Sequence, residues 1–126
     1  MSHQPRVLIL DDEPSHLKLY AWILERHGFT PVPVLVGMKP PTFQDHPDVD
    51  IVVLDYTYRT GVKATEVAEQ VRKRWAEIQI IVLSDMMWMP DDIKDTANSF
   101  VRKGEPEQLI AKVAELTGFA ANAAGV

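Results

Sequence analysis

The sequence contains no cysteine, which excludes disulfide bonds, thiolate catalysis and cysteine-bound zinc. It has no apolar run near the roughly 20 residues that a membrane-spanning helix needs, and its polar start, Met1–Pro5, lacks the apolar core of a signal peptide. No basic stretch is long enough to follow a phosphate backbone, and the net charge is −5. These absences predict a soluble, cytoplasmic protein that binds neither nucleic acid nor a membrane.

The length of 126 residues fits one domain with one core. Hydrophobic residues make up 46% of the chain and charged residues 25%, so a folded globular state is expected rather than disorder. We expect the single domain, 1–126, to have its core over about 5–118. The small residues that dominate 119–126 predict a frayed tail.

Short apolar runs rich in β-branched residues recur along the chain. Three of them are nearly continuous and cover residues 7–10, 51–54 and 78–83. Such runs are typical of strands in a parallel sheet that helices cover on both faces. Two weaker strands are expected over 30–35 and 99–103. The first contains Pro31 and Pro33 and the second Arg102, which suits both to the edges of a sheet.

Helical periodicity fills most of the intervals between these runs. Three amphipathic helices are predicted over residues 14–27, 63–75 and 106–117. Pro14 and Pro106 suit first helical positions, and Gly28 suits a helix end. A shorter helix is expected over 91–98. Another is expected within 37–48, short or distorted because prolines interrupt it.

The alternation of strands and helices predicts an α/β fold with right-handed crossovers. Five strands then form an open, doubly wound parallel sheet with helices on both faces. The flavodoxin-like strand order 2-1-3-4-5 is favoured, because it places the two weak strands at the edges.

Polar side chains follow the predicted strands at their carboxyl ends, where ligands bind in such sheets. They are Asp11, Asp12, Asp55, Ser84 and Lys103. Any one of the aspartates alone could simply cap a helix. Clustered carboxylates, however, repel one another unless a proton or a cation intervenes. Mg²⁺ suits oxygen ligands and phosphate groups, and a carboxylate beside it can form an aspartyl phosphate.

In this order and at these strand ends, the residues resemble the receiver domain of two-component response regulators. The resemblance spans nearly the whole chain. It implies that Asp55 accepts a phosphoryl group from a phosphohistidine on a sensor histidine kinase or a phosphotransfer protein. It also implies a Mg²⁺ ion held by Asp11, Asp12, Asp55 and the backbone carbonyl of Thr57.

The resemblance assigns further roles on the same edge of the sheet. Lys103 would pair with Asp55 and then with the phosphoryl group, while Ser84 and Phe100 would be the switch residues. Their movement would change the face formed by the family's fourth helix, fifth strand and fifth helix. A downstream protein or an output domain would read that face, so the implied role is signalling rather than enzymatic turnover.

The chain departs from the family pattern in three places. The loop after Asp55 reaches its glycine, Gly61, two residues early and lacks the family's proline. Gly104 replaces a proline that often follows the family's lysine, although glycine can adopt unusual dihedral angles. Asp85 stands where the family has a small residue, and we expect it to point to solvent.

These departures keep a second hypothesis open, a pseudo-receiver that binds proteins without being phosphorylated. A third and less favoured one is a Mg²⁺-dependent phosphohydrolase. Such enzymes have an Asp-x-Asp motif at the nucleophile. Here the residue two positions after Asp55 is Thr57 rather than a second aspartate. Tyr56 and Tyr58 flank Thr57 and are expected to cover the loop.

The run Met86–Met89 places three methionines and Trp88 in a predicted loop ahead of Pro90. Loop backbone favours solvent, so the four side chains cannot all be buried. One interpretation has two of them packed inward and two incidentally exposed, and the other makes the run an adaptable binding patch. Trp88 is predicted to be at least partly exposed and to form part of a partner or homodimer surface.

Overall fold

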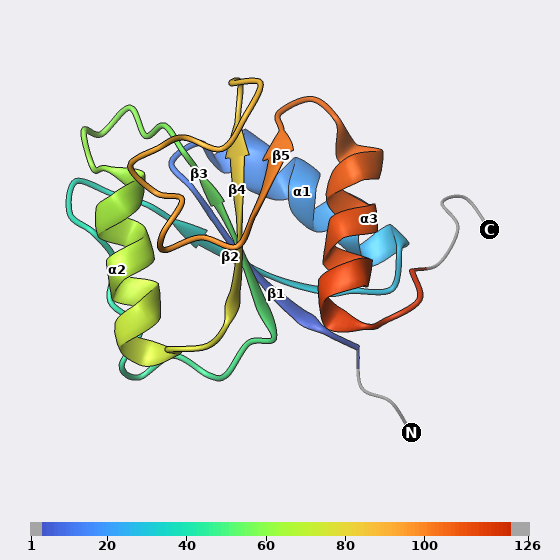
Figure 1. The fold of residues 1–126 in the computed structure, drawn as a ribbon. Coiled ribbons are helices and arrows are strands. Elements are labelled where there is room, and N and C mark those ends of the chain that lie inside the picture. The colour runs from blue at the N-terminus through green and yellow to red at the C-terminus, as the bar shows by residue number, and fades with distance from the viewer. Residues whose placement is uncertain (1–3, 122–126) are drawn as a thin grey trace.

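The structure is a computed structural model in which residues 4–121 are described. Its sheet is parallel and five-stranded, in the order β2-β1-β3-β4-β5, which confirms the predicted topology (Figure 1). The strands are β1 (Arg6–Asp11), β2 (Thr30–Leu35), β3 (Ile51–Asp55), β4 (Gln79–Ser84) and β5 (Ser99–Arg102). The two weakly patterned segments, β2 and β5, are the edge strands as expected.

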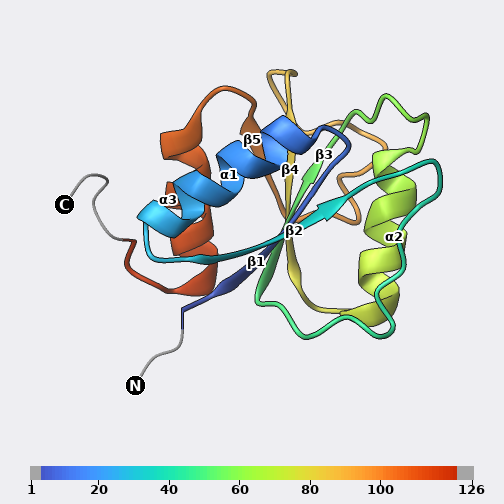
Figure 2. The ribbon, with the colours of Figure 1, turned by 180° about the vertical axis from the view of Figure 1, so that it is seen from behind.

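Helices cover both faces of this sheet, as the sequence predicts. They are α1 (Pro14–Arg26), α2 (Ala64–Arg74) and α3 (Pro106–Thr117). α1 and α3 lie together on one face, and α2 is the helix on the other face (Figures 1 and 2). Proline opens α1 and α3, and Gly118 ends α3 in the left-handed conformation with a φ of +68°.

The strand β3 shows why the apolar runs are continuous. Its five residues are all buried. Val52 and Leu54 pack in the cluster that includes α2, whereas Ile51 and Val53 pack in the cluster that includes α1 and α3. Because side chains alternate along a strand, burial on both faces requires an apolar residue at nearly every position.

The helix expected within 37–48 is absent, and the segment between β2 and β3 is irregular with one turn. Pro40, Pro41 and Pro47 lack the N–H groups that a helix needs and disfavour helical dihedrals in the residues before them. Phe43 is nonetheless buried, so the segment covers the sheet without being helical.

The helix expected over 91–98 is also absent, and turns replace it. A helix this short is marginal unless packing supports it, and this segment anchors itself through only two buried apolar side chains, Ile93 and Ala97. The Thr96 carbonyl accepts a hydrogen bond of 2.8 Å from the Arg72 guanidinium. The prediction was wrong because the Asn98 amide already donates to the Ile80 carbonyl at 2.9 Å, so pairing with β4 begins where the helix would end and leaves a stretch too short for a stable helix.

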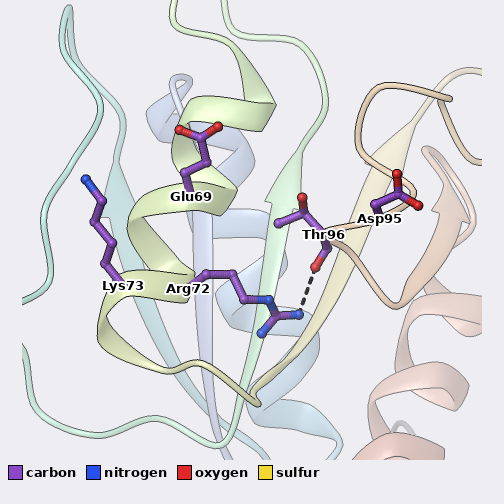
Figure 3. Close-up of a pocket in the computed structure, with 5 residues that line it drawn as sticks. All are labelled: Glu69, Arg72, Lys73, Asp95 and Thr96. Atoms are coloured by element: carbon purple, nitrogen blue, oxygen red, sulfur yellow. Dashed lines mark hydrogen bonds between the residues drawn. The ribbon is translucent and has the colours of Figure 1, made fainter.

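Arg72 fastens this segment to the end of α2 (Figure 3). Its guanidinium also donates to the Ile78 carbonyl and, at 3.0 Å, to Oδ1 of Asn98. The same Asn98 oxygen accepts from the Ile80 amide at 2.8 Å. A cavity of about 500 Å³ lies beside Arg72 and is lined by Glu69, Arg72, Lys73, Asp95 and Thr96. The face carrying α2 is therefore completed by two irregular segments instead of by further helices.

The chain stays attached to the fold shortly beyond α3. The Phe119 ring lies 5.4 Å from the Phe29 ring, centroid to centroid, so the packed region extends past the predicted core end at 118. The rest of the expected tail, 122–126, lies outside the described residues. Within 4–121, no helix has the length and apolar character needed to cross a membrane.

Candidate functional site

Three carboxylates converge where β1 and β3 end. Asp11 is the last residue of β1 and Asp55 the last of β3, and these strands are parallel neighbours with Leu10 opposite Leu54. Asp12 follows directly. One oxygen from each carboxylate lies within 4.8 Å of the others. Asp11 and Asp55 are buried, so their negative charges are poorly screened by water.

Lys103 reaches this cluster from the far side of β4. Its Nζ lies 2.7 Å from Oδ1 of Asp55, and its side chain is only 25% exposed. The Lys103 amide donates to the Ser84 carbonyl, and this hydrogen bond fixes the backbone of Lys103 beside the end of β4. One ammonium therefore faces three carboxylates, which leaves an excess of negative charge.

Asp11 carries the clearest electrostatic signature in the cluster. Burial raises the pKa of its carboxyl, and the nearby charge of Asp55 raises it further, whereas the Glu13 N–H donates to Oδ1 at 2.9 Å and lowers it. His16, in the first turn of α1, places Nδ1 3.3 Å from Oδ2 of Asp11. The site thus holds its carboxylates together against an electrostatic cost.

The short loop after Asp55 closes against the cluster through its backbone. The Thr57 amide donates to Oδ1 of Asp55 at 3.1 Å, and the Arg59 amide donates to Oδ2 of Asp12 at 2.6 Å. The Arg59 guanidinium lies 3.9 Å from the Glu13 carboxylate and is mostly exposed. Backbone amides directed at carboxylates hold these side chains in fixed orientations.

Two phenols beside the carboxylates were not predicted as parts of the site. Tyr58 is buried, and its hydroxyl points to the Leu10 carbonyl at 3.5 Å, beneath the acids rather than over the loop. Burial raises its pKa, as do the charges of Asp55 and Asp11. Burial likewise raises the pKa of Tyr20 in α1 to about 12, with help from Asp11. The short loop length was the only sequence signal for Tyr58.

The two expected switch residues occupy different environments. Ser84 is buried at the end of β4, and its Oγ accepts a hydrogen bond of 3.1 Å from the Met86 amide. Phe100 lies opposite Val82 on the edge strand β5 and is partly buried. Ser84 is thus tied to the loop that follows it.

The departures at Gly104 and Asp85 take the expected forms. Gly104 has a φ of +83°, in the left-handed region that favours glycine, so the turn after the site lysine uses glycine's freedom in place of a proline. Asp85 is exposed, as predicted.

The loop after β4 projects beyond the end of the sheet (Figures 1 and 2). Met86, Met87 and Trp88 are 39%, 65% and 64% exposed, which confirms the predicted exposure of Trp88. Met89 is the member of the run that packs against the core. Three apolar side chains face solvent here, one more than the interpretation with two packed inward predicts.

The donor set fits a hard divalent cation. Asp11, Asp12 and Asp55 offer only oxygen atoms, and their charges exceed that of Lys103. Mg²⁺ binds such carboxylates while keeping water and phosphate oxygens as further ligands. The arrangement can therefore hold a cation, a carboxylate nucleophile and an ammonium around one phosphoryl group.

The sequence matches no family model and no curated protein. Solved structures are similar in fold. A receiver domain of a Francisella response regulator aligns with a TM-score of 0.76 and 19% identity, over 91% of this chain and 98% of that one. A CheY-like receiver domain protein of Methanospirillum hungatei gives 0.78 and 18%, over 92% and 95%.

A chemotaxis response regulator of Vibrio cholerae aligns with a TM-score of 0.74 and 17% identity, over 90% of this chain and 99% of that one. The chain has the fold of response regulator receiver domains.

Proposed function

We propose that the protein is a phospho-accepting receiver domain and that Asp55 is its acceptor. The phosphoryl group would come from a phosphohistidine of a sensor histidine kinase or a phosphotransfer protein. One observation carries the proposal: Asp55 is buried at a strand end, 2.7 Å from Lys103 and clustered with Asp11 and Asp12. A purely structural salt bridge would not need two further carboxylates beside it.

In the proposed transfer, a carboxylate oxygen of Asp55 attacks the phosphorus. The phosphorus–nitrogen bond breaks, and the imidazole of the donor leaves with the electron pair and takes up a proton from solvent. Asp11, Asp12, Asp55 and the Thr57 carbonyl would hold Mg²⁺, which when bound neutralises the phosphoryl oxygens. Lys103 would exchange its pairing with Asp55 for the new phosphoryl group.

Ser84 would couple phosphorylation of Asp55 to the loop that follows β4. Its Oγ accepts from the Met86 amide, and its hydroxyl proton can be donated to a phosphoryl oxygen. Turning toward the phosphoryl group would remove the acceptor of Met86. No helix is present over 91–98, so the segment 85–98, together with β5 and Phe100, would take the place of the family's helical output face.

The experiment that tests the proposal is intact-mass measurement after incubation with a small acyl phosphate and Mg²⁺. The wild type should gain one phosphoryl group, and Asp55→Asn should gain none. Omission of Mg²⁺ should abolish labelling in the wild type. Equal labelling of both proteins would remove Asp55 as the acceptor.

A second candidate is the phosphorylation-independent pseudo-receiver. The missing helix over 91–98 favours it, because the family's output face is remodelled here. A wild type that stays unlabelled while binding Mg²⁺ would support this alternative. In either case the protein acts as a signalling module, and any phosphoryl transfer is to itself.

A further inference from the structure

The loop after β4 presents an apolar surface that the fold does not use. We call Met86, Met87 and Trp88 the methionine–tryptophan patch. Each of the last two is nearly two-thirds exposed, and the loop projects beyond the sheet (Figures 1 and 2). Three adjacent large apolar side chains in solvent are costly unless a ligand covers them.

Both ends of the loop are fixed. At its start, the Met86 amide donates to the buried Ser84 hydroxyl oxygen at 3.1 Å. At its end, Met89 packs against the core, Pro90 is buried and Ile93 is fully buried. The exposure of the patch therefore follows from the anchored geometry and is not the result of an unattached chain.

The surroundings of the patch are acidic. Three exposed carboxylates, Asp85, Asp91 and Asp92, precede or follow it closely, and the exposed Lys94 pairs with Asp91 at 4.0 Å. Two copies placed patch to patch would bring like charges together, which is unfavourable. Anionic lipid would be repelled for the same reason. The charge pattern complements a cationic partner.

We propose that the methionine–tryptophan patch binds a cationic amphipathic segment of a partner protein. The apolar side of that segment would cover Met86, Met87 and Trp88, and its lysines or arginines would face the surrounding aspartates. Methionine adapts to varied apolar surfaces, and tryptophan anchors interfaces. The inference is independent of phosphoryl transfer, because it rests on exposure and charge alone.

The test uses a synthetic helical peptide of leucine and lysine with an apolar stripe, and a leucine–glutamate peptide of the same pattern as control. Binding is followed by NMR of the methionine methyl groups. Met38, which is 80% exposed and neighbours Lys39 rather than aspartates, is an internal control for nonspecific contact. The methyl signals of Met86 and Met87 should shift with the cationic peptide, and that of Met38 should not.

Variants then separate the two components of the surface. Trp88→Ala should weaken binding about thirtyfold, as for an interface hot spot, while Met38→Ala leaves the affinity unchanged. The double variant Asp85→Asn/Asp91→Asn should weaken binding several-fold and reduce its dependence on salt. Asp55→Asn should bind like the wild type, which separates this proposal from the phosphoryl-transfer proposal.

Four results would overturn the inference. They are equal binding of the glutamate peptide, an equal shift of Met38, Trp88-dependent self-association in sedimentation, and Trp88-dependent binding to vesicles of anionic lipid. The third would assign the patch to a second copy of the chain, and the fourth to a membrane surface.

Discussion

The Nζ atom of Lys103 lies 2.7 Å from Oδ1 of Asp55, although β4 lies between β3, which carries Asp55, and β5, which Lys103 follows. Lys103 follows β5, the edge strand, and its side chain spans the end of β4 to reach the end of β3. A surface lysine gains little by taking up such a fixed position, since exposed ion pairs contribute at most about 1 kcal/mol. Here the carboxylate is buried, so the ammonium compensates a desolvated charge.

Lys103→Ala should therefore destabilise the protein by about 1–3 kcal/mol, because the buried Asp55 carboxylate loses its ammonium and keeps only the Thr57 amide as a donor. The protein should still fold, and labelling of Asp55 by an acyl phosphate should become slow. Urea unfolding and the labelling rate measure the two effects. Lys112→Ala is the control, since that lysine pairs with the exposed Glu115 in α3 and should alter neither quantity appreciably.

Asp12→Asn should weaken Mg²⁺ binding while preserving or raising the stability of the metal-free protein. The asparagine oxygen can still accept from the Arg59 amide, but one of the three repelling charges is gone. Calorimetric titration with Mg²⁺ and thermal unfolding without it give the two readouts. Asp45→Asn, an exposed change in the irregular segment before β3, is the matched control. An unchanged affinity in Asp12→Asn would contradict the metal assignment.

The phenol of Tyr20 should ionise only in strongly alkaline solution. Its pKa is raised from 10.0 to about 12, first by burial and then by Asp11 and Asp55. A raised pKa means that Tyr20 contributes stability that is fully present below pH 10.0 and is lost as the pH rises through about 12. Ultraviolet titration of phenolate absorbance should lose its step near pH 12 in Tyr20→Phe. A step that persists there in the variant would show that another tyrosine is responsible.

The sequence predicts the sheet and the gathering of polar side chains at one edge of it, because both follow from local patterns. Apolar runs define the strands, and Asp11, Asp55 and Ser84 end three of them, so the parallel topology alone brings these residues to one edge. The two absent helices have different causes: prolines interrupt 37–48, whereas 91–98 is held by contacts with other elements. The Arg72 guanidinium, from another element, satisfies the carbonyl of Thr96, and no local periodicity can reveal such a bond.

The position of Tyr58 escaped sequence reasoning for a similar reason. In the sequence, a tyrosine three residues after an acidic strand end is equally compatible with a side chain that covers the loop and with one that is buried. Only the short path of the loop, held by amides of Thr57 and Arg59 on two carboxylates, turns the ring beneath the cluster. Which face a loop side chain takes depends on hydrogen bonds between segments distant in sequence.

Ser84→Ala should release the start of the loop that carries Met86 and Trp88. The substitution removes the oxygen that accepts from the Met86 amide, and alanine fills nearly the same buried space. Hydrogen exchange at the Met86 amide should accelerate, whereas exchange in the buried strand β3 should stay unchanged. Ser84→Thr keeps a hydroxyl acceptor and should retain the slow exchange of the wild type.

The same pair of variants tests whether the loop responds to the acceptor site. If Ser84 turns toward the phosphoryl group on Asp55, then labelling the wild type should accelerate Met86 amide exchange to the rate found in Ser84→Ala. Labelled Ser84→Ala should show no further change, since its amide has already lost the acceptor. Labelled wild type that keeps slow exchange at Met86 would show that phosphorylation leaves the Ser84–Met86 bond intact and that the signal leaves the site by another route.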